Sequence, residues 1–302
     1  MTQPPITIEK QKNGYIGRFS VMASPCEILV DIPNFEMAEH SQGTIESMMW
    51  SVYHEAKRIE QKFSRYVIGN IVHTINQSNG ESVVVDDETA RLIDFAFQCY
   101  ELSDGLFDIS SGVLRTVWRF DGSDNVPDQK NIQPILKNIG LNKLTWHSPS
   151  LTLPKGMELD FGGIGKEYAV DCCLQMASRL IKHPILINFG GDLACNGPRD
   201  NNQPWQVGIE SVGGGAPAAI KLPHGALATS GDARRYLIKN NIRYSHILNP
   251  LTGFSVMDAP RSITIAAPTC VEAGLMSTMA MLQGKEAEEF LKQQEIPHWI
   301  QA

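Results

Sequence analysis

The chain has 302 residues, of which 42% are hydrophobic and 20% are charged, and its formal net charge is −7. This composition excludes extensive disorder, and the acidic balance without a long basic run argues against nucleic acid as a partner. A phosphorylated ligand would therefore have to be bound locally, by backbone amides, a few cations or a metal ion.

The N-terminal residues lack the basic and apolar regions of a signal peptide, and no apolar run reaches the length of a membrane span. The six cysteines form no CxxC pair and no cluster with zinc-site spacing, so we expect reduced, buried thiols. These features predict a cytoplasmic protein that is not inserted in a membrane.

The first half of the chain predicts strands followed by amphipathic helices. Residues 14–32 alternate in type as a strand pair does, with a turn at Met22. Apolar residues recur every three or four positions over 42–63, which predicts a helix, and a second helix is expected over 86–104. The remaining elements expected here are a polar surface loop at 121–131, a short helix at 132–139 and a hairpin over 144–153.

The middle of the chain contains the stretch 158–171, in which an apolar lead-in is followed by three glycines, Lys166 and a helical pattern over 167–180. Glycines let the backbone approach a ligand, and a helix that starts directly after them offers unpaired N–H groups to an anion. The spacing matches neither a P-loop nor a dinucleotide fingerprint. By itself the stretch fits an ordinary strand-to-helix turn better than a phosphate site.

The second half predicts a largely antiparallel sheet. Strands are expected at 184–189, 205–209, 218–222, 225–230, 236–239, 243–247 and 262–267, with a hairpin formed by 218–222 and 225–230 and a glycine-rich loop at 211–217. An apolar helix is expected over 272–282 and a charged helix over 285–293. Because hairpin turns outnumber βαβ crossovers, we expect one α+β domain over 1–302.

Three residues each allow two interpretations. His246 could be a structural hydrogen-bonding group or a general base. Thr278 could satisfy its hydroxyl on the preceding helical turn or could bind a hard metal ion. Tyr66 could be an ordinary aromatic at a helix end or a surface on which a flat ring stacks. Residue types and spacing alone support only an α+β domain that binds a phosphorylated small molecule.

A series of short motifs follows one another along nearly the whole chain. They are Met22, Phe-Ser-Arg-Tyr (63–66), Ser-Asp-Gly-Leu-Phe-Asp (103–108), Trp118, Leu-Asp-Phe-Gly-Gly-Ile-Gly-Lys (159–166), Tyr-Ala-Val-Asp (168–171), Asn-Phe-Gly-Gly-Asp (188–192), Thr-Ser-Gly (229–231), His-Ile-Leu-Asn-Pro (246–250), Thr-Gly (252–253) and Ser-Thr (277–278). Each motif is weak alone, but their order and spacing together resemble the ApbE family of FAD:protein FMN transferases. The resemblance implies an α+β, T-fold-like architecture.

The resemblance also implies an activity. Members of the family bind FAD and a divalent metal ion, usually Mg²⁺, and transfer FMN to a threonine or serine hydroxyl of an acceptor flavoprotein with release of AMP. Some members hydrolyse FAD to FMN and AMP instead, and many are exported lipoproteins.

The site residues that the resemblance implies fall into three groups. The residues implied to contact FAD are Met22, Tyr66, Phe107, Asp108, Asp160, Lys166 and Thr229. Thr278 would bind the metal ion through its side chain, and Gly163 would bind it through its backbone carbonyl. His246 would take the proton of the acceptor hydroxyl.

The sequence departs from the family pattern on the last apolar helix. The family usually has an aspartate four residues before the metal-binding threonine, where the two side chains share a helix face, but this chain has Gly274. Glu272 is the nearest acid, yet on an ideal helix it points about 200° away from position 274 unless the helix begins later. We expect Gly274→Asp to tighten metal binding. Two lesser departures are Asn249, where the family often has aspartate, and Glu167, where glycine is frequent.

Three hypotheses remain open. The first is an FMN transferase with a modified metal-ligand set that includes Glu272. The second is an FAD-binding relative that acts as an FAD pyrophosphatase or flavin carrier with little transferase activity, and the third is a structural or interaction protein that has lost the ligand. An abandoned site would lose its other implied residues more widely, which argues against the third hypothesis, and of the remaining two we favour the first. The retained residues are Tyr66, Asp160, Lys166, His246 and Thr278.

Overall fold

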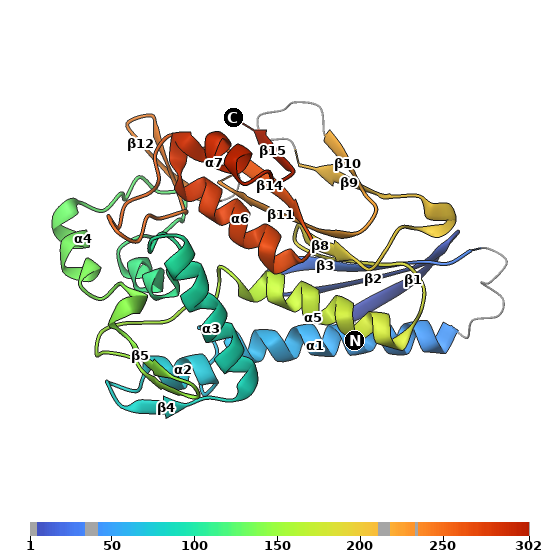
Figure 1. Ribbon diagram of the computed structural model, residues 1–302, viewed down its shortest axis with the longest axis horizontal. Coiled ribbons are helices and arrows are strands. Elements are labelled where there is room, and N and C mark those ends of the chain that lie inside the picture. The colour runs from blue at the N-terminus through green and yellow to red at the C-terminus, as the bar shows by residue number, and fades with distance from the viewer. Residues whose placement is uncertain (1–4, 34–41, 211–217, 233–234, 302) are drawn as a thin grey trace.

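The computed structural model describes residues 5–33, 42–210, 218–232 and 235–301, so the loop expected at 211–217 lies outside the described residues. Within these ranges an antiparallel sheet of eight strands forms the centre of the fold, in the order β1-β2-β3-β7-β8-β11-β14-β15 (Figure 1). The strands are β1 (Ile6–Gln11), β2 (Gly14–Val21), β3 (Ser24–Asp31), β7 (Ile185–Phe189), β8 (Asp192–Cys195), β11 (Gly225–Gly231), β14 (Ser262–Ala267) and β15 (His298–Gln301). The predicted α+β class with a mostly antiparallel sheet is confirmed.

Side chains that alternate along the central strands enter two different cores. In β7, Ile185, Ile187 and Phe189 pack into the main core, whereas Leu186 packs into a smaller core on the other face. This is the period of two that an extended strand imposes. The smaller core is covered by the hairpin of β9 (Trp205–Ile209) and β10 (Ala218–Leu222), which pair with each other. Both faces of the sheet centre are therefore buried.

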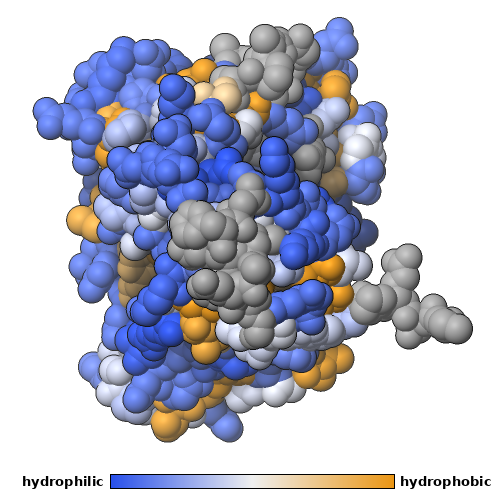
Figure 2. All heavy atoms as spheres, turned by 90° about the vertical axis from the view of Figure 1, so that its right-hand side faces the viewer, coloured by the Kyte–Doolittle hydropathy of each residue, from blue (hydrophilic) through white to orange (hydrophobic). Residues whose placement is uncertain are grey.

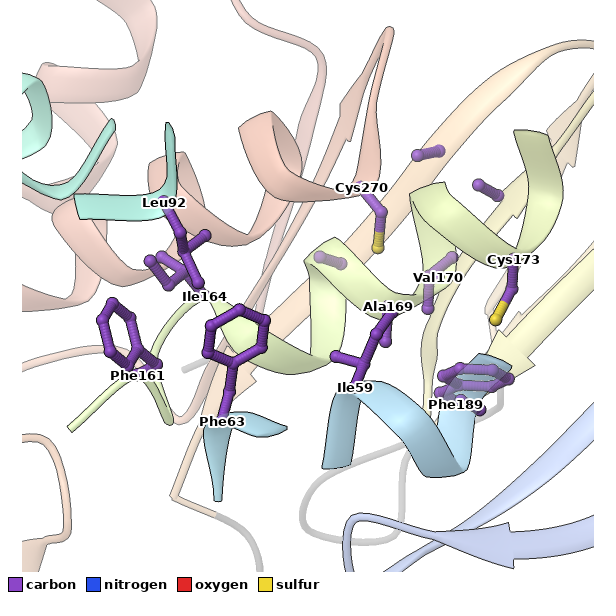
Figure 3. Packing of buried hydrophobic residues seen from close by; sticks show 14 of the residues in the cluster. Ile59, Phe63, Leu92, Phe161, Ile164, Ala169, Val170, Cys173, Phe189 and Cys270 are labelled. Atoms are coloured by element: carbon purple, nitrogen blue, oxygen red, sulfur yellow. The ribbon is translucent and has the colours of Figure 1, made fainter. Parts of the chain in front are cut away.

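Three helices cover the main-core face: α1 (Gln42–Phe63), α5 (Gly165–Leu180) and α6 (Cys270–Leu282). In Figure 1 they lie side by side, with α5 in the middle. Figure 3 shows Ile59 of α1 near Ala169 and Val170 of α5, while Cys270 of α6 points toward α5 from the other side. The buried residues of α1 recur at three- and four-residue spacing, as predicted for one helical face.

Many of the other elements lie at the end of the molecule that carries α4 in Figure 1. The other elements are α2 (Ile71–Asn76), β4 (Ser82–Val84), α3 (Asp87–Leu102), η1 (Ile109–Thr116), α4 (Gln129–Leu136), η2 (Leu141–Lys143), β5 (Thr145–His147), β6 (Ser150–Thr152), η3 (Asp200–Asn202), β12 (Tyr236–Lys239), β13 (Ile242–Ser245), η4 (Gly284–Glu286) and α7 (Ala287–Gln293). The face shown in Figure 2 is mostly hydrophilic, with hydrophobic residues in small separate areas, as is usual for a protein surface. Among the described residues, no helix has the length and apolar character needed to cross a bilayer.

The hairpin predicted from 218–222 and 225–230 is wrong. β10 pairs with β9, whereas β11 lies between β8 and β14 in the large sheet. The two strands differ in what they pack against, because Ile220 and Leu222 of β10 belong to the smaller core while Ala226 and Ala228 of β11 lie under the helices. The pairing of 218–222 with 225–230 was predicted because the two segments are close in sequence. The strands separate because each packs into a different core.

Other boundaries also shift. The short helix expected at 132–139 begins three residues earlier, at Gln129, and ends at Leu136. The strands β1, β4, β8 and β15 were not expected from the sequence. They are short or lie at the sheet edge, so their hydrophobic pattern is incomplete.

Candidate functional site

A cleft of about 2330 Å³ brings together segments that are far apart in the sequence. It is bordered by the β2–β3 turn, the segment after α1, the start of α5, the strands β8 and β11, and α6. The expected site residues that line it are Met22, Tyr66, Phe107, Asp108, Asp160, Gly163, Lys166, Thr229, His246 and Thr278. Glu272 is the expected residue that does not line it.

The start of α5 faces the cleft without a side-chain cap. Its N-cap residue, Ile164, offers no capping oxygen, and the preceding Gly162 and Gly163 are exposed. A Cβ built on Gly163 would lie 3.5 Å from the buried Phe107 ring, so the loop passes close to this aromatic side chain. The Gly165 N–H already donates to the Phe161 carbonyl at 2.7 Å, so an anion would be received by the N–H groups that follow it in the first turn.

Lys166 adds a positive charge at the same place. Its Nζ lies 2.6 Å from Oδ2 of the buried Asp192 on β8. Burial alone would lower the pKa of Lys166, but the carboxylates of Asp192 and Glu167 raise it above its ordinary value. The ammonium group is therefore charged at neutral pH and remains partly accessible from the cleft.

Asp160 is held from two sides before α5 begins. Its Oδ1 accepts a hydrogen bond from the Gly162 N–H at 2.9 Å, and its Oδ2 forms an ion pair with Arg65. Arg65 also donates to the hydroxyl of Tyr66 at 2.8 Å. Tyr66 is 78% exposed, so its ring offers an open surface at the edge of the cleft. This arrangement suits a flat aromatic ligand better than a role in the core.

Asp108 and Met22 are fixed by local structure. The Asp108 Oδ1 accepts hydrogen bonds from the backbone N–H and the hydroxyl of Ser110, both at 2.7 Å, and caps η1. Burial raises the pKa of Asp108 above its ordinary range. Met22 has a φ of 54° in the β2–β3 turn, and its N–H donates to Glu60 of α1 at 2.5 Å. The turn is thereby tied to the helix beside the cleft.

His246 lies on the segment after β13. Its Nδ1 is 3.2 Å from the backbone carbonyl of Arg235. A carbonyl can only accept, so Nδ1 carries the hydrogen and Nε2 keeps a free lone pair. Burial lowers the pKa of His246, and the positive charge of Arg235 lowers it further. The ring is therefore neutral at pH 7 and can accept a proton.

Hydroxyl groups gather where β11 meets α6. The Thr278 Oγ1 lies 3.0 Å from the Ser230 Oγ, which also lies 2.8 Å from the Ser277 Oγ. One residue earlier on β11, the N–H of Thr229 donates to Asp192 at 3.2 Å. Strand β11 thus connects the hydroxyl group of Thr278 with the Asp192–Lys166 pair.

Glu167 occupies the space beside Gly274. A Cβ built on Gly274 would lie 2.6 Å from the Glu167 Cγ and 3.1 Å from its Oε1. The Glu167 Oε2 is buried and has no hydrogen-bond partner among the described residues. Burial and the neighbouring Asp192 raise the pKa of Glu167 to about 8. A buried carboxyl oxygen without a partner is costly and calls for an explanation.

Glu272 does not lie with the other residues expected to bind the metal ion. Helix α6 begins at Cys270, so Glu272 lies in its first turn, where it completes a capping box with Thr269. The Thr269 N–H donates to Glu272 Oε2 at 3.2 Å, and the Glu272 N–H donates to Thr269 Oγ1 at 3.3 Å. Glu272 is exposed and faces away from Gly274 and the cleft.

The donors present fit a hard divalent cation that also binds phosphate. Within the described residues no three His, Cys, Asp or Glu side chains are grouped to hold a metal ion by themselves. Mg²⁺ rarely needs such a group, because it is commonly held by one or two carboxylates, substrate phosphates and water. The buried Glu167 oxygen and the Thr278 hydroxyl are oxygen donors of this kind, and both residues line the cleft.

Among the cleft residues that were not expected as site residues, four contact the expected ones or lie beside them: Arg65, Glu167, Asp192 and Ser230. Three of them lie within the recognised motifs, so the motif positions themselves pointed to them. Glu167 was visible only as a departure from the family pattern, and its connection with Gly274 requires knowing that α5 and α6 are neighbours.

Comparison with known proteins gives a consistent result. The sequence model of the ApbE family matches residues 22–300. The FAD:protein FMN transferase of Haemophilus influenzae is 26% identical over 245 residues, covering 76% of this chain and 70% of that protein. The protein of the same name from Vibrio cholerae is 26% identical over 239 residues, covering 76% and 71%.

Solved structures agree in fold. The ApbE protein of Thermotoga maritima superimposes with a TM-score of 0.83 at 29% identity, covering 98% of this chain and 94% of that chain. The apo form of the flavinyl transferase ApbE from Pseudomonas stutzeri superimposes with a TM-score of 0.82, covering 99% and 92%, and at 22% identity this likeness supports the fold alone.

Proposed function

The chain belongs to the ApbE family, and we propose that it is an FAD:protein FMN transferase, which moves FMN from FAD to a threonine or serine hydroxyl of an acceptor flavoprotein and releases AMP. The observation that carries the proposal is the convergence of every site residue expected from the resemblance, except Glu272, on one cleft. The relatives that bear this name, at about 26% identity, support the same activity.

In this proposal the ring and the diphosphate of FAD contact different parts of the cleft. The exposed ring of Tyr66 would stack on a flat ring of FAD, with Met22, Phe107, Asp108 and Thr229 as further contacts. The diphosphate would lie at the uncapped start of α5, where backbone N–H groups and the Lys166 ammonium favour negative charge. Asp160 would border this region, held by Arg65.

The reaction is a phosphoryl-type transfer that needs a deprotonated nucleophile. The acceptor oxygen bonds to the phosphorus atom of the FMN half, and the bond from that phosphorus to the bridging oxygen breaks, so that AMP leaves with this oxygen. The proton of the acceptor hydroxyl goes to His246 Nε2, whose lone pair is free because Nδ1 faces the Arg235 carbonyl.

A divalent cation, for which we propose Mg²⁺, would be held by the Thr278 hydroxyl and the Gly163 carbonyl and would supply charge neutralisation on the diphosphate. The residues around it orient these groups. Ser230 contacts the Thr278 hydroxyl, and Phe107 packs against Gly163.

We further propose that residues 1–302 work as one domain, because β1 and β15, near the two ends of the chain, belong to the same sheet. The cytoplasmic location stays a prediction from the sequence.

The proposal is tested by incubating the purified protein with FAD, Mg²⁺ and candidate acceptor flavoproteins encoded beside it. We expect a covalent mass increase on an acceptor equal to FMN less water, with one AMP released per flavin transferred, and loss of both when EDTA is added. Release of free FMN and AMP without any acceptor labelling would instead indicate an FAD pyrophosphatase. Calorimetry that detects no FAD binding with or without Mg²⁺ would remove both activities.

His246→Asn separates catalysis from binding. We expect the transfer rate to fall by roughly 10²- to 10⁴-fold, the usual contribution of a general base, while the affinity for FAD changes little. Since burial lowers the pKa of His246, the wild-type rate should already be at its plateau at neutral pH and should fall only below the ordinary histidine range. A variant rate equal to that of the wild type would exclude His246 as the base.

A further inference from the structure

We propose that Glu167 of α5 provides the divalent cation with the carboxylate ligand that α6 lacks at position 274. The proposal rests on the proposed function, since the cation is the one that accompanies FAD. It assigns a direct role to a residue that the family resemblance gave only as a departure.

The first observation is geometric. The Glu167 side chain lies against the bare Cα of Gly274, where a side chain attached to position 274 would begin. Position 274 is one helical turn before Thr278, so the two positions share one face of α6. The carboxylate therefore reaches the same face as the Thr278 hydroxyl, although it comes from the neighbouring helix, and both residues line the cleft.

The second observation is the unpartnered oxygen. Glu167 Oε2 is buried with no hydrogen bond among the described residues, while the nearby Asp192 carboxylate is fully engaged. Asp192 binds Lys166 through Oδ2 and accepts from the Thr229 N–H through Oδ1. A purely structural carboxyl group would be expected to have a similar set of donors.

The third observation is the balance of charge. Lys166 can neutralise one carboxylate, and Asp192 already holds it at 2.6 Å. The thiol of Cys270, which is also buried here, stays neutral because burial raises its pKa well above the usual value. Lys166 is therefore not available to balance a carboxylate at Glu167, and a cation bound there would supply that charge.

The same contact explains the two departures from the family pattern together. In the family pattern, with aspartate at position 274 and glycine at position 167, the carboxylate belongs to α6. In this chain, with Gly274 and Glu167, the carboxylate belongs to α5. The two side chains compete for one volume, because a Cβ at 274 would come within 2.6 Å of Glu167. Gly274→Asp alone is therefore no longer expected to tighten metal binding, which corrects the expectation drawn from the sequence.

The test is a set of variants whose metal affinity is measured rather than their turnover. Mn²⁺ serves as the probe, because the electron paramagnetic resonance signal of free Mn²⁺ falls when the ion binds, and the titration is made on the FAD-loaded protein. The variants are Glu167→Gln, Glu167→Gly, Gly274→Asp, the double variant Glu167→Gly/Gly274→Asp, and Glu272→Gln as the matched control.

We expect Glu167→Gln and Glu167→Gly to weaken Mn²⁺ binding by about tenfold to 100-fold, the loss typical of groups that support a metal site. The double variant should regain affinity to within about threefold of the wild type, because the carboxylate returns from α6. Glu272→Gln should bind Mn²⁺ like the wild type, since Glu272 belongs to the capping box.

Wild-type affinity in Glu167→Gln would overturn the proposal, and so would an equal loss in Glu272→Gln. Circular dichroism and unfolding measured without metal ion identify any variant that fails to fold. If a single variant fails to fold, the Mn²⁺ affinity of the double variant decides the test. If the proposed function is wrong, the result is different: the wild-type protein does not bind FAD or does not label an acceptor. A wild type that labels an acceptor while Glu167→Gln keeps full Mn²⁺ affinity overturns the role of Glu167 alone.

Discussion

The two helices that border the cleft, α5 and α6, begin in opposite ways. The start of α6 is closed: Thr269 and Glu272 form a capping box, and the carboxylate of Asp171 accepts from the Cys270 and Val271 N–H groups at 2.8 and 2.9 Å. The start of α5 has no side-chain cap among the described residues and follows exposed glycines.

The difference separates a structural helix start from one that is available to a ligand. At the start of α6 the N–H groups of Cys270, Val271 and Glu272 already donate to side chains of the chain itself. An added anion would therefore find these N–H groups occupied. At α5 the chain supplies a cation, Lys166, and leaves the acceptor to the ligand. An open helix start must be held by other contacts, and the Tyr168 hydroxyl does this by donating to Glu88 of α3 at 2.9 Å.

The largest effect is expected where the open helix start loses its charge. Lys166→Met should weaken FAD binding by about tenfold to 100-fold, corresponding to the roughly 1.5–3 kcal/mol of a charge-assisted hydrogen bond. It should also lower the melting temperature, because the buried Asp192 loses its partner. Fluorescence titration with FAD measures the affinity, and Lys155→Met, at an exposed lysine, is the control. An unchanged dissociation constant would mean that the anion binds elsewhere.

A smaller effect is expected at the closed helix start. Asp171→Ala leaves the Cys270 and Val271 N–H groups without their acceptor, so the free energy of unfolding should fall by about 1–3 kcal/mol. FAD affinity should stay within about twofold, because Asp171 does not line the cleft. Urea unfolding gives the stability, and a large loss of FAD affinity in a folded variant would contradict the separation of the two roles.

The smallest effect is expected at the contact that holds α5 and appears mainly in acid. A hydrogen bond from Arg58 lowers the pKa of Glu88 to about 2, helped by Lys62 and Tyr168 and opposed by burial. Because the folded-state pKa lies below the unfolded value near 4.5, the stabilisation by Glu88 is complete above that pH and is lost as the pH falls toward 2.

Glu88→Gln should therefore lose less stability than the wild type when the pH is lowered from about 5 to about 3. Asp86, whose pKa is also about 2 and which shares Lys62, should leave part of the acid dependence in the variant. Unfolding at several pH values measures both, with Glu286→Gln at the exposed Lys285 pair as the control. Identical pH profiles would assign the acid dependence to other groups.

Much of the fold followed from local patterns. The helix over 42–63 was predicted to the residue, since seven buried apolar positions repeat at helical spacing. The second helix, expected over 86–104, spans Asp87–Leu102 with Asp86 as its N-cap. The position of β11 could not be predicted in the same way, because a short strand of small residues pairs according to the layer above it and not according to its neighbour in sequence.

The residues of the cleft could be predicted because the motifs follow one another in the order typical of the family. The contact between α5 and α6 could not be predicted. Gly274 was singled out from the sequence as a position without the usual carboxylate. Glu272 does not take its place, because α6 begins at Cys270 and Glu272 lies in the capping box. Glu167 could be linked to Gly274 only through the packing of α5 against α6, a tertiary contact that leaves no periodic signal in the chain.

The contact between Glu167 and Gly274 predicts that substitutions at these two distant positions are coupled in evolution. Two acids would collide there, and under the role that we propose for Glu167 two glycines would leave the cation without a carboxylate ligand. Among relatives, an acid at one position should therefore accompany a glycine at the other, and the exchange requires passage through a crowded or an empty intermediate. A sequence search that requires a carboxylate at position 274 would reject such a chain as inactive. A search that accepts a carboxylate at either position 167 or position 274 would retain it.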